Sequence, residues 1–123
     1  MKVTPPNWDL LRHLLLQRSG GRDEITGLPL NPDSFDAHHR RPKGMGGTNR
    51  PDRDTLSNLL ALAPNTHNGG PRSVHARRGW SEEHGYLLPQ STPIAGSWPV
   101  LLFGTRWVYL LNQAPWYRDV PRR

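Results

Sequence analysis

The chain has no cysteine, which excludes disulfide bonds and thiolate metal sites. Apolar residues are scarce as well, at 34% of 123 residues, so only a small hydrophobic core is expected. No apolar run approaches the roughly 18 residues that a membrane-spanning helix needs. The leucine-rich N-terminus has no small-residue cleavage site and places Asp9 and Arg12 beside its apolar stretch, which argues against a signal peptide. These absences predict a protein that does not enter a membrane.

Proline, glycine and positive charge are what the sequence has in excess. The 13 prolines and 12 glycines predict many loops and turns, and the 5 tryptophans supply large rings to the core. The formal net charge is +6 and the isoelectric point is near 10.8. A small basic protein of this kind favours a polyanionic partner, although a surface that is merely basic is the simpler alternative.

Patterns along the chain predict one α+β domain with additions at both ends. Helical spacing of apolar residues predicts an N-terminal helix over residues 7–18. A strand is expected from Ser34 to Arg40 and another in SNLLALAP, with helical segments after it. The apolar runs WPVLLFG and RWVYLLN predict a C-terminal β-hairpin over residues 97–113, and residues 114–123 are expected to form a basic tail.

Two adjacent histidines, His38 and His39, stand near the end of the first predicted strand, ahead of a long glycine- and arginine-rich loop. Imidazole is the commonest metal ligand and also the side chain that accepts protons near neutral pH. Neighbours on a regular strand point to opposite faces, so one ion cannot bind both. The pattern favours a division of roles, in which one ring holds a metal and the other deprotonates water. A histidine pair alone more often has no such function.

The segments HHRRPKGMGG and SNLLALAPNTH, taken together and in this order, resemble the HNH endonucleases encoded by phages. The resemblance runs from Asp23 to His75 and implies a small ββα-metal core over about residues 23–85. It implies that Asn58 ties the loop to the second strand and orients the general base. By position in the family motif, the general base is His39 and the first two metal ligands are His38 and His67.

The third metal ligand has two candidates. The family often has a histidine one helical turn after His67, but Pro71 stands there. On a continuous helix His75 would lie two turns away, about 12 Å along the axis. The Gly69-Gly70-Pro71 insert interrupts such a helix, and a reversal there would bring His75, on a new helix, against His67; we favour this ligand. Asp36 is the alternative, about 7 Å from the first histidine of the pair on the same strand face.

The ligand types restrict the cofactor to one divalent ion. Neutral nitrogen ligands suit zinc, nickel, cobalt or manganese, whereas magnesium prefers oxygen ligands. If Asp36 replaced a histidine, magnesium or manganese would be favoured.

Many relatives in this family also carry a structural zinc ribbon made of two cysteine pairs. Here the frame is kept without its thiols, because Asp23 and Thr26 stand at the first pair and Ala63 and Thr66 at the second. We therefore expect no structural zinc, and we expect the N-terminal helix and the C-terminal hairpin to hold these turns instead.

Basic residues on both sides of the proposed site predict contacts with phosphate groups, which give affinity without sequence information. No recognisable major-groove reading motif is present, so the expected substrate is DNA bound with weak sequence preference, and RNA is a second candidate. The expected phosphate contacts are Arg40, Arg41, Lys43, Arg72, Arg77 and Arg78.

The sequence therefore predicts a metal-dependent DNA endonuclease. A non-catalytic nucleic-acid-binding module on the same scaffold is one alternative, and the intact His39 argues against it. A toxin-type nuclease is the other, and the absence of translocation or receptor regions argues against it. The resemblance to phage proteins permits a role in genome processing, with packaging proteins as partners and the host cytoplasm as the compartment. A monomer and a homodimer, and nicking and double-strand cutting, are all compatible with the sequence.

Overall fold

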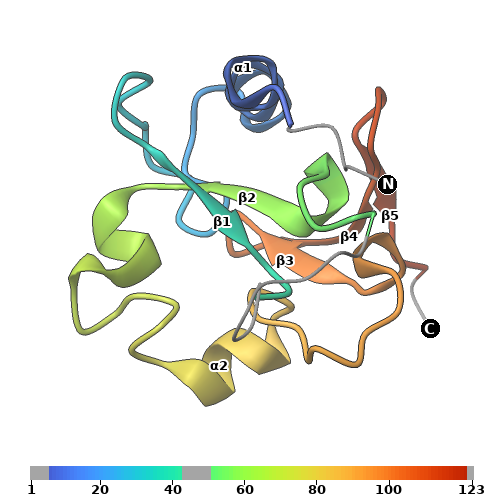
Figure 1. Ribbon diagram of the computed structural model, residues 1–123. Coiled ribbons are helices and arrows are strands. Elements are labelled where there is room, and N and C mark those ends of the chain that lie inside the picture. The colour runs from blue at the N-terminus through green and yellow to red at the C-terminus, as the bar shows by residue number, and fades with distance from the viewer. Residues whose placement is uncertain (1–5, 43–50, 122–123) are drawn as a thin grey trace.

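The computed structural model describes residues 6–42 and 51–121 of the chain. Lys43 and the glycine cluster that follows it lie outside the described residues. The fold is α+β, with few helices and two small antiparallel sheets (Figure 1). Among the residues described, no helix is long and apolar enough to cross a bilayer. The elements in chain order are α1 (Trp8–Ser19), β1 (Asp36–His39), η1 (Leu56–Asn58), β2 (Leu59–Leu62), η2 (Asn65–Gly69), α2 (Arg78–Glu83), η3 (Ala95–Ser97), β3 (Val100–Leu102), β4 (Arg106–Leu110) and β5 (Tyr117–Asp119).

Strand β2 lies between the two hydrophobic clusters of the protein, and α1 and α2 lie on opposite sides of it (Figure 1). Leu60 belongs to the cluster that includes Val108 of β4, and Leu59 belongs to the cluster that includes Leu15 of α1. Successive side chains of a strand point to opposite faces, so a strand covered on both faces must be apolar at every position. This burial explains the continuous apolar run in SNLLALAP.

Strands β1 and β2 form an antiparallel pair in which His38 lies opposite Leu60 and His39 opposite Leu59. Residues opposite each other in such a pair share a face of the sheet. His38 therefore faces the cluster of β3 and β4, and His39 faces α1. The two imidazoles point to opposite faces, as strand alternation predicts.

The second sheet has the order β3-β4-β5. Strands β3 and β4 form a hairpin within residues 97–113, and Gly104 in its turn has a φ of 75°, a left-handed conformation that favours glycine. The following residues were expected to run out as a tail, but Tyr117–Asp119 pairs with β4 as β5. A three-residue strand is too short for a sequence pattern to reveal, because its existence depends on the pairing partner.

A buried ion pair anchors helix α1 to the start of β2. The helix begins after Asn7, whose side-chain oxygen accepts the N–H of Leu10. In its last turn the Arg18 guanidinium lies 2.6 Å from the Glu24 carboxylate, and both side chains are fully buried. Arg18 also donates to the carbonyl oxygens of Leu56 and Leu59. The pair is therefore surrounded by hydrogen-bonding partners, which a buried charge pair requires.

Asp23 links the two turns at which the family resemblance places ribbon cysteines. Its Oδ1 accepts the N–H groups of Ile25 and Thr26 at 2.9 Å, and its Oδ2 accepts the N–H of Ala63 at 2.8 Å. The Asp23 side chain is buried, so these charge-assisted bonds are shielded from water. A carboxylate thus connects the two turns.

Candidate metal centre

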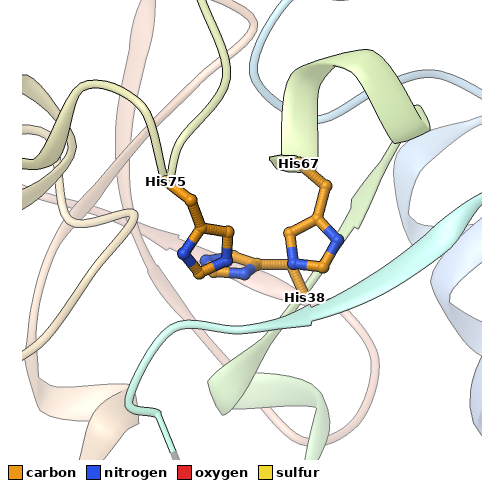
Figure 2. A group of neighbouring side chains, drawn as sticks. All are labelled: His38, His67 and His75. Atoms are coloured by element: carbon orange, nitrogen blue, oxygen red, sulfur yellow. The ribbon is translucent and has the colours of Figure 1, made fainter. Parts of the chain in front are cut away.

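Three imidazoles from separate parts of the chain converge beside the β1–β2 pair (Figure 2). One ring nitrogen of each of His38, His67 and His75 lies within 4.8 Å of the corresponding nitrogens of the other two. The ring centroids are 5.0 Å apart for His38 and His67, 5.0 Å for His67 and His75, and 5.5 Å for His38 and His75. The three rings are close enough to bind one metal ion.

Each ring is delivered by a different local structure. His38 stands on β1, and His67 lies in η2, a single π-helical turn directly after β2. After Gly70 the chain reverses, and the N–H of Val74 donates to the carbonyl of Thr66 at 2.7 Å. The reversal expected from Gly69-Gly70-Pro71 is thus present. The expected helix beneath His75 is not, because this residue lies in a turn and α2 begins only at Arg78.

The ring nitrogens turned away from the cluster have hydrogen-bond partners that set the tautomers. Nε2 of His38 lies 2.6 Å from the carbonyl oxygen of Tyr86, and a carbonyl can only accept, so Nε2 carries the proton. Nδ1 of His67 lies 2.9 Å from Oδ2 of Asp36. Lone pairs are thereby left on Nδ1 of His38 and Nε2 of His67. Metal-binding histidines usually have such partners on their second nitrogen.

Asp36 is consequently not a member of the candidate ligand group. Its carboxylate is hydrogen-bonded to the far nitrogen of the His67 ring. The sequence left Asp36 and His75 as rivals for the third ligand position, and the geometry brings His75 into the group. Asp36 instead holds the ring of His67, one of the candidate ligands.

The surroundings of His38 and His75 favour the neutral form of these two imidazoles. Burial lowers the pKa of His38 to about 3, and the nearby His67 and His75 rings add to this effect. Burial and the neighbouring His67 also lower the pKa of His75. A neutral ring is the form that donates a lone pair to a metal. The three rings are thus close enough for one metal ion, and burial keeps two of them, His38 and His75, in the form that can donate a lone pair to it.

His39 lies beside the cluster without belonging to it. Its Nε2 lies 2.7 Å from Oδ1 of Asp54, and the indole of Trp8 approaches its ring edge-on at 5.9 Å. A cavity of about 190 Å³ is lined by His39 and Pro42 together with the three clustered histidines. His39 therefore helps to line the same cavity as the proposed ligands, although its ring points to the α1 side of the β1–β2 pair.

Asn58 ties the loop to the strand as the resemblance implies. Its Oδ1 accepts the N–H of Arg41 at 2.8 Å, and its Nδ2 donates to the carbonyl of Arg53 at 2.9 Å. Asn58 is fully buried, so these bonds are shielded from water. They connect the end of β1 with the segment that precedes η1.

The expected DNA contacts of Arg40 and Arg41 require a correction. Arg40 is fully buried and its N–H groups donate to backbone carbonyls, and Arg41 is 1% exposed and paired with Asp52. Burial lowers the pKa of Arg40 to about 9, so it remains cationic at neutral pH. Neither guanidinium reaches the surface, and both brace the loops that surround β1. The carbonyls that accept from Arg40 belong to Ser57, Gly85, Ala95, Trp98 and Pro99.

The remaining basic residues of the prediction have different surroundings. Arg72 and Arg78 are exposed, and Arg78 lines a cavity of about 480 Å³ together with His75. Arg77 is half-buried, with its guanidinium 3.7 Å above the ring of Trp80. Lys43 lies outside the described residues. Positive charge is thus available next to His75.

Sequence reasoning missed Asp54 and Trp8 as neighbours of His39. Asp54 is 15 residues after His39 in a loop that the sequence marks mainly by its arginines. No spacing rule relates this aspartate to the histidine pair. Trp8 reads as a core residue of the N-terminal helix. His84, read as a surface group, is partly buried and stacks with Tyr86 and Trp107.

Comparisons with protein-family models, with curated proteins and with solved structures found no match to this chain. The support for the candidate site is therefore the geometry of its residues alone.

Proposed function

We propose that the protein is a metal-dependent endonuclease that hydrolyses phosphodiester bonds of DNA with little sequence preference. The observation that carries this proposal is that four histidines, His38, His39, His67 and His75, line one cavity. Three of them form a candidate ligand group, and the fourth, His39, is outside that group. Metal-assisted hydrolysis of a phosphodiester uses both of these functions in one place.

The residues would divide the reaction as follows. A divalent ion held by the three clustered histidines would polarise a phosphate oxygen and neutralise charge on the leaving oxygen. His39 accepts a proton from a water molecule, whose oxygen forms a bond to phosphorus as the bond to the leaving oxygen breaks. Arg78, next to His75, would neutralise a neighbouring phosphate of the strand.

The proposal includes a ββα-metal core. Its support is the antiparallel β1–β2 pair, in which one strand carries the histidine pair and the other begins directly after Asn58. His67 follows directly in a helical turn. In this chain the helical part of the core would be reduced to η2 and the short α2.

A plasmid-cleavage assay tests the proposal directly. Protein stripped with EDTA is assayed alone and with added zinc, nickel, cobalt, manganese or magnesium. We expect cutting only with metal, and a loss of about 10²- to 10⁴-fold in His39→Ala, which is the range that a general base contributes. His67→Ala should lose both metal binding and cutting, whereas His13→Ala, on the exposed face of α1, serves as the matched control.

The outcomes separate an enzyme from a binding module. Cutting that is lost in His39→Ala while zinc affinity is kept supports the assignment of a base distinct from the ligands. If wild-type protein binds DNA but cuts with none of the five metals, or if His39→Ala cuts as fast as wild type, the endonuclease proposal is wrong.

A further inference from the structure

The carboxylate of Asp54 fixes the imidazole of His39 at one end. The distance from Nε2 of His39 to Oδ1 of Asp54 is 2.7 Å, and the two side chains are 16% and 12% exposed. The other carboxylate oxygen accepts from Nε and Nη2 of Arg53, both at 2.8 Å. Because both oxygens are engaged, the carboxylate has a defined orientation toward the ring.

Asn58 holds the two halves of this pair together. One end of its amide binds the N–H of Arg41, two residues after His39. The other end binds the carbonyl of Arg53, one residue before Asp54. The buried amide thus couples the end of β1 to the segment that supplies the carboxylate. On the α1 side the edge-on contact with Trp8 further restricts the ring.

The protonation of the pair follows from its hydrogen bonds. Burial alone would raise the pKa of the Asp54 carboxyl, but the bonds from His39 and Arg53 outweigh burial and keep that pKa below its usual value. Asp54 is therefore an anion at neutral pH and accepts the Nε2 proton of the ring. The proton-accepting lone pair of His39 is then on Nδ1.

We infer that Asp54 is a positioning residue for the proposed general base, selecting the tautomer of His39 and stabilising the imidazolium that forms when the ring takes a proton from water. This inference rests on the proposed function. A single proton is transferred in this step. It moves from water to Nδ1 of His39, while the Nε2 proton stays in the hydrogen bond to Asp54. A carboxylate that holds an imidazole in this way acts through the base and does not touch the substrate.

The test compares Asp54→Asn with Asp119→Asn. Both changes remove one carboxylate that is paired with an arginine, but Asp119 pairs with Arg106 on the exposed sheet edge. For Asp54→Asn we expect kcat for plasmid cleavage to fall about 10-fold or more, but by less than in His39→Ala, which removes the base itself, with KM and zinc affinity changed less than about twofold. Asp119→Asn should match wild type in all three quantities.

A spectroscopic measurement adds a readout that does not depend on catalysis. Long-range ¹H–¹⁵N correlation spectra of the metal-free protein report which nitrogen of His39 is protonated. Wild type should show the Nε2-protonated tautomer, and Asp54→Asn should show a mixture of the two tautomers.

The outcomes distinguish the two proposals. If wild-type protein fails to cut with every one of the five metals, the proposed function itself is overturned. Wild-type protein that cuts, together with Asp54→Asn at full kcat or with an unchanged tautomer, overturns the Asp54 inference alone. A fall in kcat that accompanies an equal loss of zinc affinity also overturns it, because the effect would then come from the ligand group.

Discussion

The backbone N–H of His75 donates a hydrogen bond to the carbonyl oxygen of His67 at 3.3 Å, across the reversal at Gly69-Gly70-Pro71. On a continuous helix these two residues would be about 12 Å apart along the axis. The reversal instead brings their ring centroids to 5.0 Å. The candidate metal centre therefore depends on a break in helical structure.

Replacing Asp36 with asparagine should weaken metal binding without removing a ligand. The carboxylate of Asp36 accepts the Nδ1 proton of His67, and loss of such an outer partner typically lowers metal affinity by about 10- to 100-fold. Competition titration with a chromogenic chelator measures the zinc affinity. Asp33→Asn, an exposed carboxylate three residues earlier, is the control and should bind as wild type. Equal zinc affinities in Asp36→Asn and Asp33→Asn would contradict the inference that Asp36 holds the ring of His67 for metal binding.

Replacing Arg40 with lysine should destabilise the protein and leave the charge unchanged. Arg40 donates to five carbonyls and lysine has only three donors, so at least two of these carbonyls would lose their partner. Each buried group left unsatisfied costs about 1–3 kcal/mol, which predicts a loss of at least about 2 kcal/mol in the free energy of unfolding. Urea denaturation measures it. The exposed Arg72→Lys should be neutral, and equal stability of both variants would contradict the bracing role.

Removing the exposed charges near His75 should change the salt dependence of DNA binding. The double variant Arg72→Ala/Arg78→Ala should lower the slope of log affinity against log salt by about 0.9 for each phosphate of duplex DNA that the protein no longer neutralises. Fluorescence anisotropy in EDTA measures binding without cleavage. Arg22→Ala/Arg118→Ala removes the same charge from exposed positions that line neither cavity at His75. An equal slope change in both double variants would show that only net charge matters.

Asp23→Asn should loosen the two turns that the carboxylate connects. An amide cannot accept at both ends, so either Ala63 or the pair Ile25 and Thr26 loses its acceptor. The expected loss in the free energy of unfolding is about 1–3 kcal/mol. Hydrogen exchange should show faster exchange at these amides, while those of α1 are little changed. Unchanged exchange at all three amides would contradict the connecting role of Asp23.

Asp52 should contribute stability that disappears in acid. Burial alone would raise its pKa, but the bonds from the Arg41 guanidinium and the N–H of Ala95 outweigh burial and keep that pKa below its usual value. A carboxyl with a lowered folded-state pKa stabilises the fold above its unfolded pKa of about 3.9, and the contribution is lost as pH falls through the folded value. The stability difference between wild type and Asp52→Asn should therefore be largest above about pH 5 and shrink below pH 4. Urea unfolding across this pH range measures the stability difference. A difference that grows as pH falls would contradict the lowered pKa of Asp52.

Several features of the site followed from local rules. The alternation of strand side chains predicted that His38 and His39 point to opposite faces, and the register with β2 confirms it. The Gly69-Gly70-Pro71 insert predicted a reversal, because glycine and proline break a helix. The resemblance placed Asn58 between loop and strand, where the structure has it. These inferences succeed because each depends on a few neighbouring residues.

The surroundings of the charged residues depended on the fold. Arg40 and Arg41 stand in a basic stretch that predicts exposed side chains. Arg40 is nevertheless buried, because carbonyls 17 to 59 residues away accept hydrogen bonds from its guanidinium. Asp54 lies beside His39 where Asn58 joins the two segments that carry them.

The sequence by itself determined where imidazoles, turns and buried strands lie along the chain, since backbone periodicity and turn chemistry act over a few residues. The tertiary structure alone decided which cations are buried and which carboxylate faces each imidazole. That decision depends on long-range packing, because the free energy of a charge is set by the groups around it in space rather than by its neighbours in sequence.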